Sequence, residues 1–228
     1  MPDDRTSVFS TGYAVRRPLV RWLDGEARLA AERERRPRLL DVGCGVKPYE
    51  HLFTPYVAEY VGVDVANPSA DLEGTVEEIP VPEGSFELVL CTQTLEHAID
   101  PARAVHELRR VVAPGGRVLV STHGVQVYHP NPVDLWRWTH AGLERLFREN
   151  GDWSAVSVTP SSGTTACLGM LVVHYLDLVA KRAHVRPLVV PFVGAVNAAA
   201  RAIDAVSPGL REPRPGTIFA NYHVVAQP

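Results

Sequence analysis

Cysteine, net charge and long uninterrupted apolar runs are all scarce in this 228-residue sequence. The three cysteines, Cys44, Cys91 and Cys167, are an odd number without metal-ligand spacing, which predicts reduced thiols in a cytoplasmic protein. A net charge of −3 gives no electrostatic reason to expect a nucleic-acid partner. The first residues show no basic segment leading into an apolar one, so we expect no secretory signal. We also expect no transmembrane segment, because no run reaches roughly 20 uninterrupted apolar residues.

The sequence does contain a glycine turn that follows a short apolar run. Residues 39–42 predict a buried parallel strand, and Gly43-Cys44-Gly45 follows directly. Glycine lets the main chain approach a ligand without a Cβ in the way. Nineteen residues after Gly45, a second apolar run ends in Asp64, whose carboxylate can accept hydrogen bonds from both hydroxyls of a ribose.

Two kinds of nucleoside ligand compete for this pair of signals. A nicotinamide dinucleotide site uses G-x-G-x-x-G, in which the third glycine allows close packing beneath a pyrophosphate. Pro48 occupies that third position here. The turn therefore suits a ribose with a compact charged tail, as in S-adenosylmethionine, better than a dinucleotide, and a nicotinamide oxidoreductase is the weaker interpretation.

Several segments then resemble class I methyltransferases. The D-V-G-C-G of residues 41–45 and the acidic strand end at Asp64 look like motifs I and II of that family, and residues 77–87 are similar to its D-A-x-x-L-P-F-P-D-G-S-F-D segment. L-E-H at residues 95–97 resembles the signature of the type 11 small-molecule group. Thr75 stands where the family commonly has the aspartate that contacts the adenine amino group. The resemblance implies S-adenosylmethionine as cofactor and the following cofactor-binding residues: Asp41, Gly43, Cys44, Gly45, Asp64, Val65, Thr75, Val76, Thr92 and Leu95.

The fold that the resemblance implies is a Rossmann-like α/β sandwich. We expect a mostly parallel seven-stranded sheet with an antiparallel edge strand and a helical insertion before the last strand. A single domain is expected. Its segments are an N-terminal lead and helix (residues 1–36), a cofactor-binding core (37–162), the insertion (163–212) and the last strand (213–228). The insertion could be a lid, a dimer surface or a membrane-surface contact.

Capping signals place the helices around the expected site. Residues 1–13 predict an unstructured lead, and an amphipathic helix is expected from Pro18 to about residue 36. Asp100 reads as an N-cap before a helix that Pro114 and the glycines after it should stop. Thr139 is expected to cap the next helix.

A proline-stiffened segment at residues 122–139 is the expected substrate-binding element. It resembles the H-P-x-P-x-D-x-W-R-W/F-T element of a subset of type 11 proteins, several of which sit among bacterial glycan or natural-product enzymes. An alternative is that Trp136 and Trp138 pack in the core while Asp134 and Arg137 pair locally. The predicted substrate-binding residues are His123, Tyr128, Asp134, Trp136 and Arg137.

Histidine is the natural general base for methyl transfer to a hydroxyl, because its ordinary pKa lies near neutrality. His97 and His129 are the predicted catalytic residues, with His123 as a further choice. His97 could instead hold the loop by a hydrogen bond to a backbone carbonyl. No H-x-x-x-H or carboxylate spacing supports a metal formed by these histidines, so no metal is expected.

The expected function is S-adenosylmethionine-dependent methylation, of a hydroxyl on a small molecule or on a sugar or glycan precursor. The alternative from another class is a non-catalytic scaffold that keeps the fold and binds a partner through its helical insertion. The departures at Thr75 and at Glu87, which replaces the final aspartate of the 77–87 segment, favour that alternative. The expected partner is a small-molecule or sugar substrate, and a second copy of the chain is a further candidate.

Overall fold

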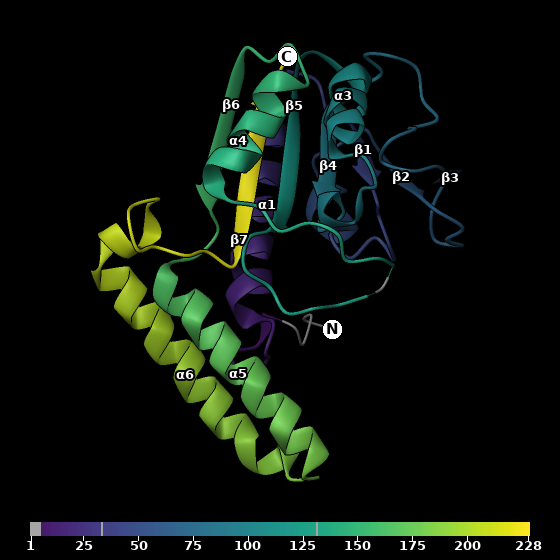
Figure 1. The fold of residues 1–228 in the computed structure, drawn as a ribbon. Helices are drawn as coiled ribbons and strands as arrows, with labels where there is room; N and C mark the ends of the chain where they lie inside the picture. The colour runs from purple at the N-terminus through teal and green to yellow at the C-terminus, as the bar shows by residue number, and fades with distance from the viewer. Residues whose placement is uncertain (1–5, 33, 131) are drawn as a thin grey trace. The chain divides into compact units, whose positions relative to one another are not determined.

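A computed structural model describes residues 6–32, 34–130 and 132–228 and contains a seven-stranded sheet in the order β3-β2-β1-β4-β5-β7-β6 (Figure 1). The pairs β1–β2, β2–β3, β1–β4 and β4–β5 are parallel, which confirms the expected mostly parallel sheet. The strands are β1 (Arg38–Val42), β2 (Glu59–Asp64), β3 (Leu72–Glu73), β4 (Phe86–Thr92), β5 (Val112–His123), β6 (Ala155–Pro160) and β7 (Asn221–Gln227).

The last strand, β7, runs antiparallel to β6. The Ser154 amide donates to the Gln227 carbonyl and the Ser161 amide to the Asn221 carbonyl, each at 2.9 Å. The residue numbers of the paired positions therefore rise along β6 as they fall along β7, which is the antiparallel arrangement. The antiparallel strand was expected at this side of the sheet; β7 lies second from the edge, between β5 and β6.

The described part of the chain forms two compact units. The smaller unit comprises the residues before Trp22 together with Gly124–Tyr128 and Thr159–Tyr222, and the larger unit comprises Trp22–His123, His129–Val158 and His223–Pro228. The expected insertion falls within the smaller unit. That the whole chain acts as one domain stays a prediction.

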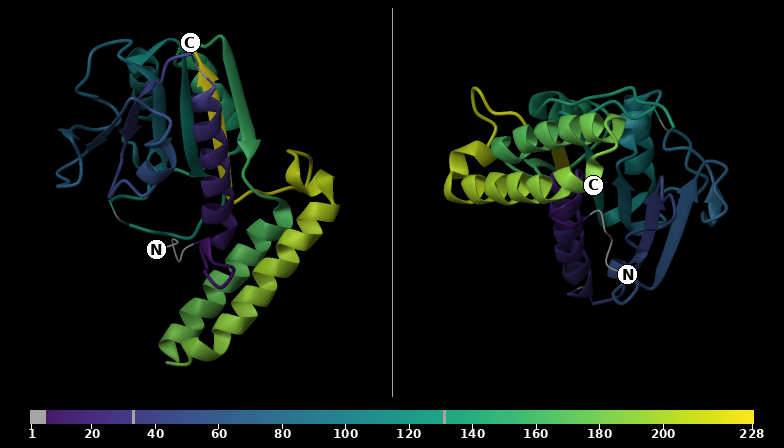
Figure 2. Two further views of the ribbon diagram at one scale, coloured as in Figure 1. Left: turned by 180° about the vertical axis from the view of Figure 1, so that it is seen from behind. Right: turned by 90° about the horizontal axis from the view of Figure 1, so that it is seen from below.

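Helices cover both faces of the sheet in the larger unit. Figure 1 shows α3 and α4 on one face, and Figure 2 shows α1 from behind, on the other. Because both faces are covered, the central strands are largely apolar, and Leu40, Val89 and Leu90 are fully buried. Cys44, Cys91 and Cys167 are free and buried, which confirms the expected thiols. The helices are α1 (Tyr13–Ala31), α2 (Glu50–Phe53), α3 (Pro101–Val111), α4 (His140–Glu149), α5 (Thr164–Arg182) and α6 (Arg186–Val206), with short 3-10 turns η2 (Leu95–His97) and η3 (Pro208–Arg211).

Both predicted N-caps are confirmed. The Asp100 carboxylate accepts hydrogen bonds from the amides of Ala102 and Arg103, and the Thr139 hydroxyl accepts one from the amide of Gly142. Helix α3 ends at Val111, before the Pro114 that was expected to stop it. The chain enters β5 at once, because Val112 pairs with the first residue of β4.

The start of the chain differs from the prediction. Helix α1 begins at Tyr13, five residues before the expected start, and it contains Pro18. Proline there removes one backbone hydrogen bond, but Ala14 and Val15 are buried in the apolar core of the smaller unit, which favours the longer helix. The lead is not unstructured over residues 6–12, where the Asn197 side chain donates to the carbonyls of Val8 and Ser10. Residues 1–5 lie outside the described part.

The insertion forms a helical hairpin in which α5 and α6 run side by side (Figures 1 and 2). The Asp204 carboxylate on α6 accepts hydrogen bonds from the amides of Thr165 and Ala166 in the first turn of α5, at 3.0 and 2.9 Å. Cys167 and Met170 are fully buried in the core of this unit. The expected helical insertion is thus present, and its two helices are tied together at one end by a buried carboxylate.

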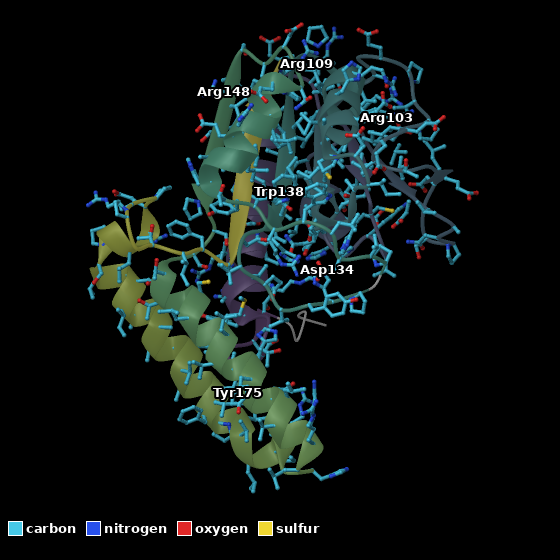
Figure 3. All side chains as sticks on the ribbon, in the orientation of Figure 1. Arg103, Arg109, Asp134, Trp138, Arg148 and Tyr175 are labelled. Atoms are coloured by element: carbon cyan, nitrogen blue, oxygen red, sulfur yellow. The ribbon has the colours of Figure 1, made fainter. Side chains whose placement is uncertain are left out.

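The length of these helices corrects one expectation. With 19 and 21 residues, α5 and α6 are long and apolar enough to cross a membrane, although sequence reasoning placed both below that limit. Uninterrupted apolar runs were the wrong criterion, because a spanning helix tolerates a few polar positions. Core helices of soluble proteins meet the same length and composition. Tyr175 on α5 is exposed (Figure 3). A lid, a dimer surface and a membrane contact remain predictions for this hairpin.

A buried histidine on β7 makes stability depend on pH. His223 is 5% exposed and stacks on Trp22, with ring centroids 4.2 Å apart. Burial lowers the pKa of His223 to about 3, whereas an unfolded chain should titrate near 6.5. The folded state needs the neutral ring, so this stabilisation is present above pH 6.5 and is lost as the pH falls toward 3. As the pH falls from 7 to 5, we expect the titration of His223 to lower the free energy of unfolding by about 2 kcal/mol.

The test compares the wild type with His223→Phe, which keeps a ring against Trp22 but cannot titrate. Urea unfolding at pH 7 and pH 5 should show a loss about 2 kcal/mol smaller in the variant. The difference between the two proteins is the relevant quantity, because other groups also titrate in this range. Burial raises the pKa of Asp41 to about 6 and of Glu96 to about 7, and these two carboxyl groups make the fold more stable as the pH falls. Equal losses in both proteins would mean that His223 titrates normally in the fold.

Candidate active site

Three residues with left-handed backbone mark the carboxyl ends of neighbouring strands. Lys47, Ala66 and Gln93 have φ values of 52°, 46° and 56° and follow β1, β2 and β4. This conformation costs a residue other than glycine roughly 1–2 kcal/mol and is concentrated at functional sites. Ligands of open α/β sheets bind at this edge. The left-handed backbone therefore lies at the strand ends where the sequence predicted the site, although nothing in the sequence around these three residues indicated their conformation.

The glycine turn is held tightly between strands. Gly43 has a φ of 73°, and a Cβ at this position would lie 2.2 Å from the Thr94 hydroxyl oxygen. The amides of Gly43 and Cys44 both donate to the Val63 carbonyl on β2, at 2.8 and 3.1 Å. Glycine is thus required twice at residue 43, for its backbone conformation and for the space that Thr94 occupies.

The turn and the acidic strand end meet as predicted. Asp64 Oδ2 accepts a hydrogen bond from the Gly45 amide at 2.7 Å, and Asp64 Oδ1 accepts one from the Val65 amide at 2.7 Å. Sequence reasoning missed Asn67, whose side-chain amide donates to the Gly45 carbonyl at 2.7 Å and to Asp64 Oδ2 at 3.1 Å. Its place in the turn-rich segment after β2 was the available signal. Asp64 is therefore held at the turn by three donors.

A second carboxylate fixes the residue after the turn. Lys47 Nζ lies 2.6 Å from Asp71 Oδ2, which also accepts a hydrogen bond from the Gly62 amide at 2.7 Å. A Cβ on Gly62 would come within 2.7 Å of the side chains of both Lys47 and Cys44. This pair, also missed from the sequence, ties the glycine turn to β2 from its other side.

Asp41, a predicted cofactor residue, lies inside the sheet. It is 1% exposed, and the Tyr60 hydroxyl donates to its Oδ2 at 2.6 Å. Burial raises the pKa of this carboxyl to about 6, and the Tyr60 hydrogen bond partly opposes that rise. Asp41 is therefore a buried carboxyl group on the strand that leads into the turn, and the Tyr60 hydroxyl holds it in place.

The other predicted cofactor residues are spread along the same edge. Thr92 is the last residue of β4 and Leu95 the first of η2; both are buried, as is Val76, whereas Thr75 and Val65 are exposed. The departure at Glu87 has a structural role, because its carboxylate accepts a hydrogen bond from the Arg38 amide at 2.8 Å. Glu87 thus joins the starts of β1 and β4, at the opposite edge from the glycine turn.

Beside the turn, past the ends of β4 and β5, the larger unit gathers a carboxylate and three histidines. Glu96 is fully buried; its Oε2 accepts a hydrogen bond from the Thr122 hydroxyl at 2.8 Å, and its Oε1 lies 3.1 Å from His123 Nε2. The His129 ring stands edge-on to those of His123 and His97, with centroids 5.0 and 5.2 Å apart. Both predicted catalytic residues are therefore brought together, along with the predicted substrate residue His123.

The tautomer of His97 follows from its hydrogen bond. Nδ1 of His97 contacts the carbonyl oxygen of Val133. A carbonyl can only accept, so Nδ1 carries the proton and Nε2 of the neutral ring keeps its lone pair. Burial is the largest influence on this ring and lowers the pKa of His97 below its usual value. His97 is thus both the loop-holding histidine of one interpretation and a ring whose other nitrogen can accept a proton.

The segment after β5 is fastened to this cluster. Figure 3 shows Asp134 and Trp138 on the connection between β5 and α4. Arg137 Nη2 donates to Asp134 Oδ2 at 2.7 Å, and this ion pair lowers the pKa of Asp134 to about 2. Trp136 stacks on Trp138 at 5.5 Å and donates from its indole to the Ala98 carbonyl at 2.7 Å.

This geometry contains parts of both interpretations of the segment. Asp134 and Arg137 pair locally, yet Trp136 is 38% exposed and so is not a core residue. Tyr128 belongs to the smaller unit and is 76% exposed, and no part of the site is built on it. The substrate-binding roles stay predictions.

Comparison with known proteins gives one family. Residues 13–153 match the model of a methyltransferase domain family. The chain is 31% identical over 102 residues to the uncharacterized methyltransferase YcgJ of Bacillus subtilis, covering 38% of this chain and 40% of that protein. It is 32% identical over 138 residues to a ubiquinone biosynthesis O-methyltransferase of Pseudomonas aeruginosa, covering 52% and 56%. The chain spans about half the length of the curated relatives that it matches.

Solved structures agree in fold. YcgJ of Bacillus subtilis superposes with a TM-score of 0.52 at 20% identity, covering 91% of this chain and 98% of that one. A phosphoethanolamine N-methyltransferase 2 of Haemonchus contortus, in complex with phosphomonomethylethanolamine and S-adenosylhomocysteine, gives 0.54 at 12% identity and covers 90% and 52%. At these identities the likeness concerns the fold alone, and it confirms the expected Rossmann-like architecture.

Proposed function

Because this chain belongs to the family of methyltransferase domains, we propose that it methylates a hydroxyl oxygen of a small molecule or of a sugar or glycan precursor. The S-adenosylmethionine-dependent activity and the acceptor are both part of this proposal. The observation that carries the proposal is His97, a neutral ring whose Nε2 is left to accept a proton by the Nδ1 contact with Val133. A hydroxyl nucleophile gains from such a base. The Pseudomonas aeruginosa relative, by its name an O-methyltransferase, supports an oxygen acceptor.

The residues at the turn fit the cofactor. S-adenosylmethionine supplies a sulfonium methyl group for an in-line displacement, so the chain has mainly to align the two reactants and exclude water. A Cβ on Gly43 would meet Thr94, whereas the space where Gly45 would carry a Cβ is open, so the backbone at Gly45 is accessible to a ligand. Asp64 Oδ1 accepts a hydrogen bond from the Val65 amide and keeps a second lone pair for a ribose hydroxyl, whereas Oδ2 accepts from the Gly45 amide and the Asn67 side chain, so the second hydroxyl would take the place of the Asn67 amide. We assign ribose binding to Asp64 and close backbone approach to Gly43–Gly45.

The residues past β5 suit a polar acceptor with a flat face. Trp136 and Trp138 present stacked indoles that are partly open to solvent, and sugars and aromatic rings pack well on such surfaces. His129 and the Asp134–Arg137 pair supply hydrogen-bonding groups beside them. These side chains would hold the acceptor while His97 takes the proton of its hydroxyl.

Replacing His97 should separate catalysis from cofactor binding. In His97→Gln the side-chain amide can still donate to Val133, so we expect S-adenosylhomocysteine affinity within about twofold of the wild type. The rate of methyl transfer should fall roughly 10²- to 10⁴-fold, the usual contribution of a general base. His106→Gln, an exposed change on α3, is the matched control and should keep the wild-type rate.

The assay incubates the enzyme and deuterium-labelled S-adenosylmethionine with a pool of sugars, glycan precursors and metabolites, and mass spectrometry finds the labelled product. A label on oxygen identifies the acceptor and supports the proposal. A label found on nitrogen or carbon instead would overturn the assignment of the acceptor atom. An unchanged rate in His97→Gln would remove His97 as the base.

A further inference from the structure

We propose that Glu96, His123 and His129 bind a divalent transition-metal ion, with zinc the best fit. One ligand atom from each of the three residues lies within 4.8 Å of the other two. Glu96 comes from η2 after β4, His123 is the last residue of β5, and His129 follows six residues later. All three belong to the larger unit. Their separation in the sequence explains why spacing alone predicted no metal.

Glu96 provides an independent indication of a ligand. Its side chain is fully buried, and its Oε1 has no hydrogen-bond partner in the described part of the chain. Buried carboxylate oxygens are ordinarily paired. His123 Nε2 lies only 3.1 Å away, but the contact lacks the geometry of a hydrogen bond, so proximity alone does not satisfy this oxygen.

The separation of these two atoms matches a shared ion. Zinc ligands lie about 2.0–2.1 Å from the metal in tetrahedral geometry, which places neighbouring ligand atoms about 3.3 Å apart. The Glu96 oxygen and the His123 nitrogen are already at that spacing. His129 is partly exposed on the segment after β5, and a shift of at most about 1.5 Å brings its ligand atom from the 4.8 Å limit to this spacing.

The donor types select the metal. Two imidazoles and one carboxylate form the ligand set of many catalytic zinc sites, which keep one position open. Magnesium and calcium prefer oxygen donors throughout. Outer contacts are present as well, because Thr122 holds the other oxygen of Glu96, and Asp134 Oδ2 lies 3.7 Å from His129 Nδ1. Carboxylates behind ligating histidines commonly orient the ring.

The open position would receive the acceptor hydroxyl. This use of the ion rests on the proposed function, whereas binding of the ion does not. A divalent ion lowers the pKa of a hydroxyl bound to it. The O–H bond breaks and its proton passes to water, the new O–C bond forms as the S–C bond of the donor breaks, and the donor departs as a neutral thioether. The ion keeps its oxidation state throughout.

The test titrates zinc chloride into untagged, EDTA-dialysed protein and follows the heat of binding, with cobalt(II) added separately to report ligand geometry by its visible absorption. We expect one ion per chain with a dissociation constant in the micromolar range or below. His129→Ala should weaken binding at least about 100-fold, and His106→Ala, an exposed histidine change on α3, should leave it unchanged. His129→Ala removes a half-exposed side chain, so retained binding of S-adenosylhomocysteine will verify its fold.

The outcomes separate this proposal from the proposed function. Absence of zinc binding by the wild type, or equal binding by His129→Ala and His106→Ala, overturns the metal site and leaves the O-methylation proposal standing. Zinc binding that depends on His129 in a protein that methylates nitrogen or carbon instead supports the site and overturns its use with a hydroxyl.

Discussion

Gly43→Ala should weaken S-adenosylhomocysteine binding at least 100-fold and lower the free energy of unfolding by about 2–5 kcal/mol. Two costs combine. A left-handed backbone costs alanine roughly 1–2 kcal/mol more than glycine, and the new Cβ would lie 2.2 Å and 2.5 Å from Oγ1 and Cγ2 of Thr94. Overpacking of this kind typically costs about 1–3 kcal/mol. The turn must shift to relieve the contact, and the shift displaces the backbone that faces the cofactor. Titration calorimetry and urea unfolding measure the two effects.

Gly45→Ala is the matched control at the other end of the turn. Gly45 has a φ of 54°, but a Cβ there would meet nothing within 4 Å, so only the backbone cost of roughly 1–2 kcal/mol should remain. Adding Thr94→Ala to Gly43→Ala should recover part of the lost stability, because it removes the two closest atoms. Equal losses in Gly43→Ala and Gly45→Ala, with no recovery, would show that crowding by Thr94 does not shape the corner.

Asp64→Ala should weaken S-adenosylhomocysteine binding by about 1–3 kcal/mol, or roughly 5- to 150-fold. The change removes the carboxylate that we propose as the acceptor of the ribose hydroxyls, and it also releases the Gly45 amide and the Asn67 side chain from the carboxylate that now holds them. Asp64→Asn should lose nearly as much, because its amide group would place donors against donors. Calorimetric titration with S-adenosylhomocysteine measures both variants.

Glu73→Gln provides the control for charge. Glu73 pairs with Asp64 in the register of β2 and β3, and its side chain is exposed. This change removes the same unit of charge one strand away, and we expect affinity within about twofold of the wild type. If Glu73→Gln and Asp64→Asn weaken binding alike, then general electrostatics rather than hydrogen bonding to Asp64 explains the effect.

Features encoded by neighbouring residues were predictable from the sequence. The glycine turn, the acidic end of β2 and the caps at Asp100 and Thr139 each depend on a few consecutive residues, and the structure contains all of them. The parallel strands were equally predictable, because strands buried on both faces are nearly continuous apolar runs. Local chemistry thus predicted the frame of the cofactor site.

Features that depend on distant partners were not predictable. Asp71 joins Lys47 across 24 residues, and nothing near either residue indicates the pair. Helix α1 extends through Pro18 because residues before it are buried by the hairpin of the same unit, which local propensity cannot register. Glu96 and His129 lie 33 positions apart, so motif spacing contained no sign of the metal site that we propose.

The central claim, that the corner after β1 and Asp64 together bind S-adenosylmethionine, is tested most directly by a crystal structure grown with excess S-adenosylhomocysteine. We predict both ribose hydroxyls on the Asp64 carboxylate, the nucleoside lying against Gly43–Gly45, and the sulfur facing His97. A structure in which Asp64 points away from the sugar, with the nucleoside bound elsewhere or the corner blocked, would contradict the account.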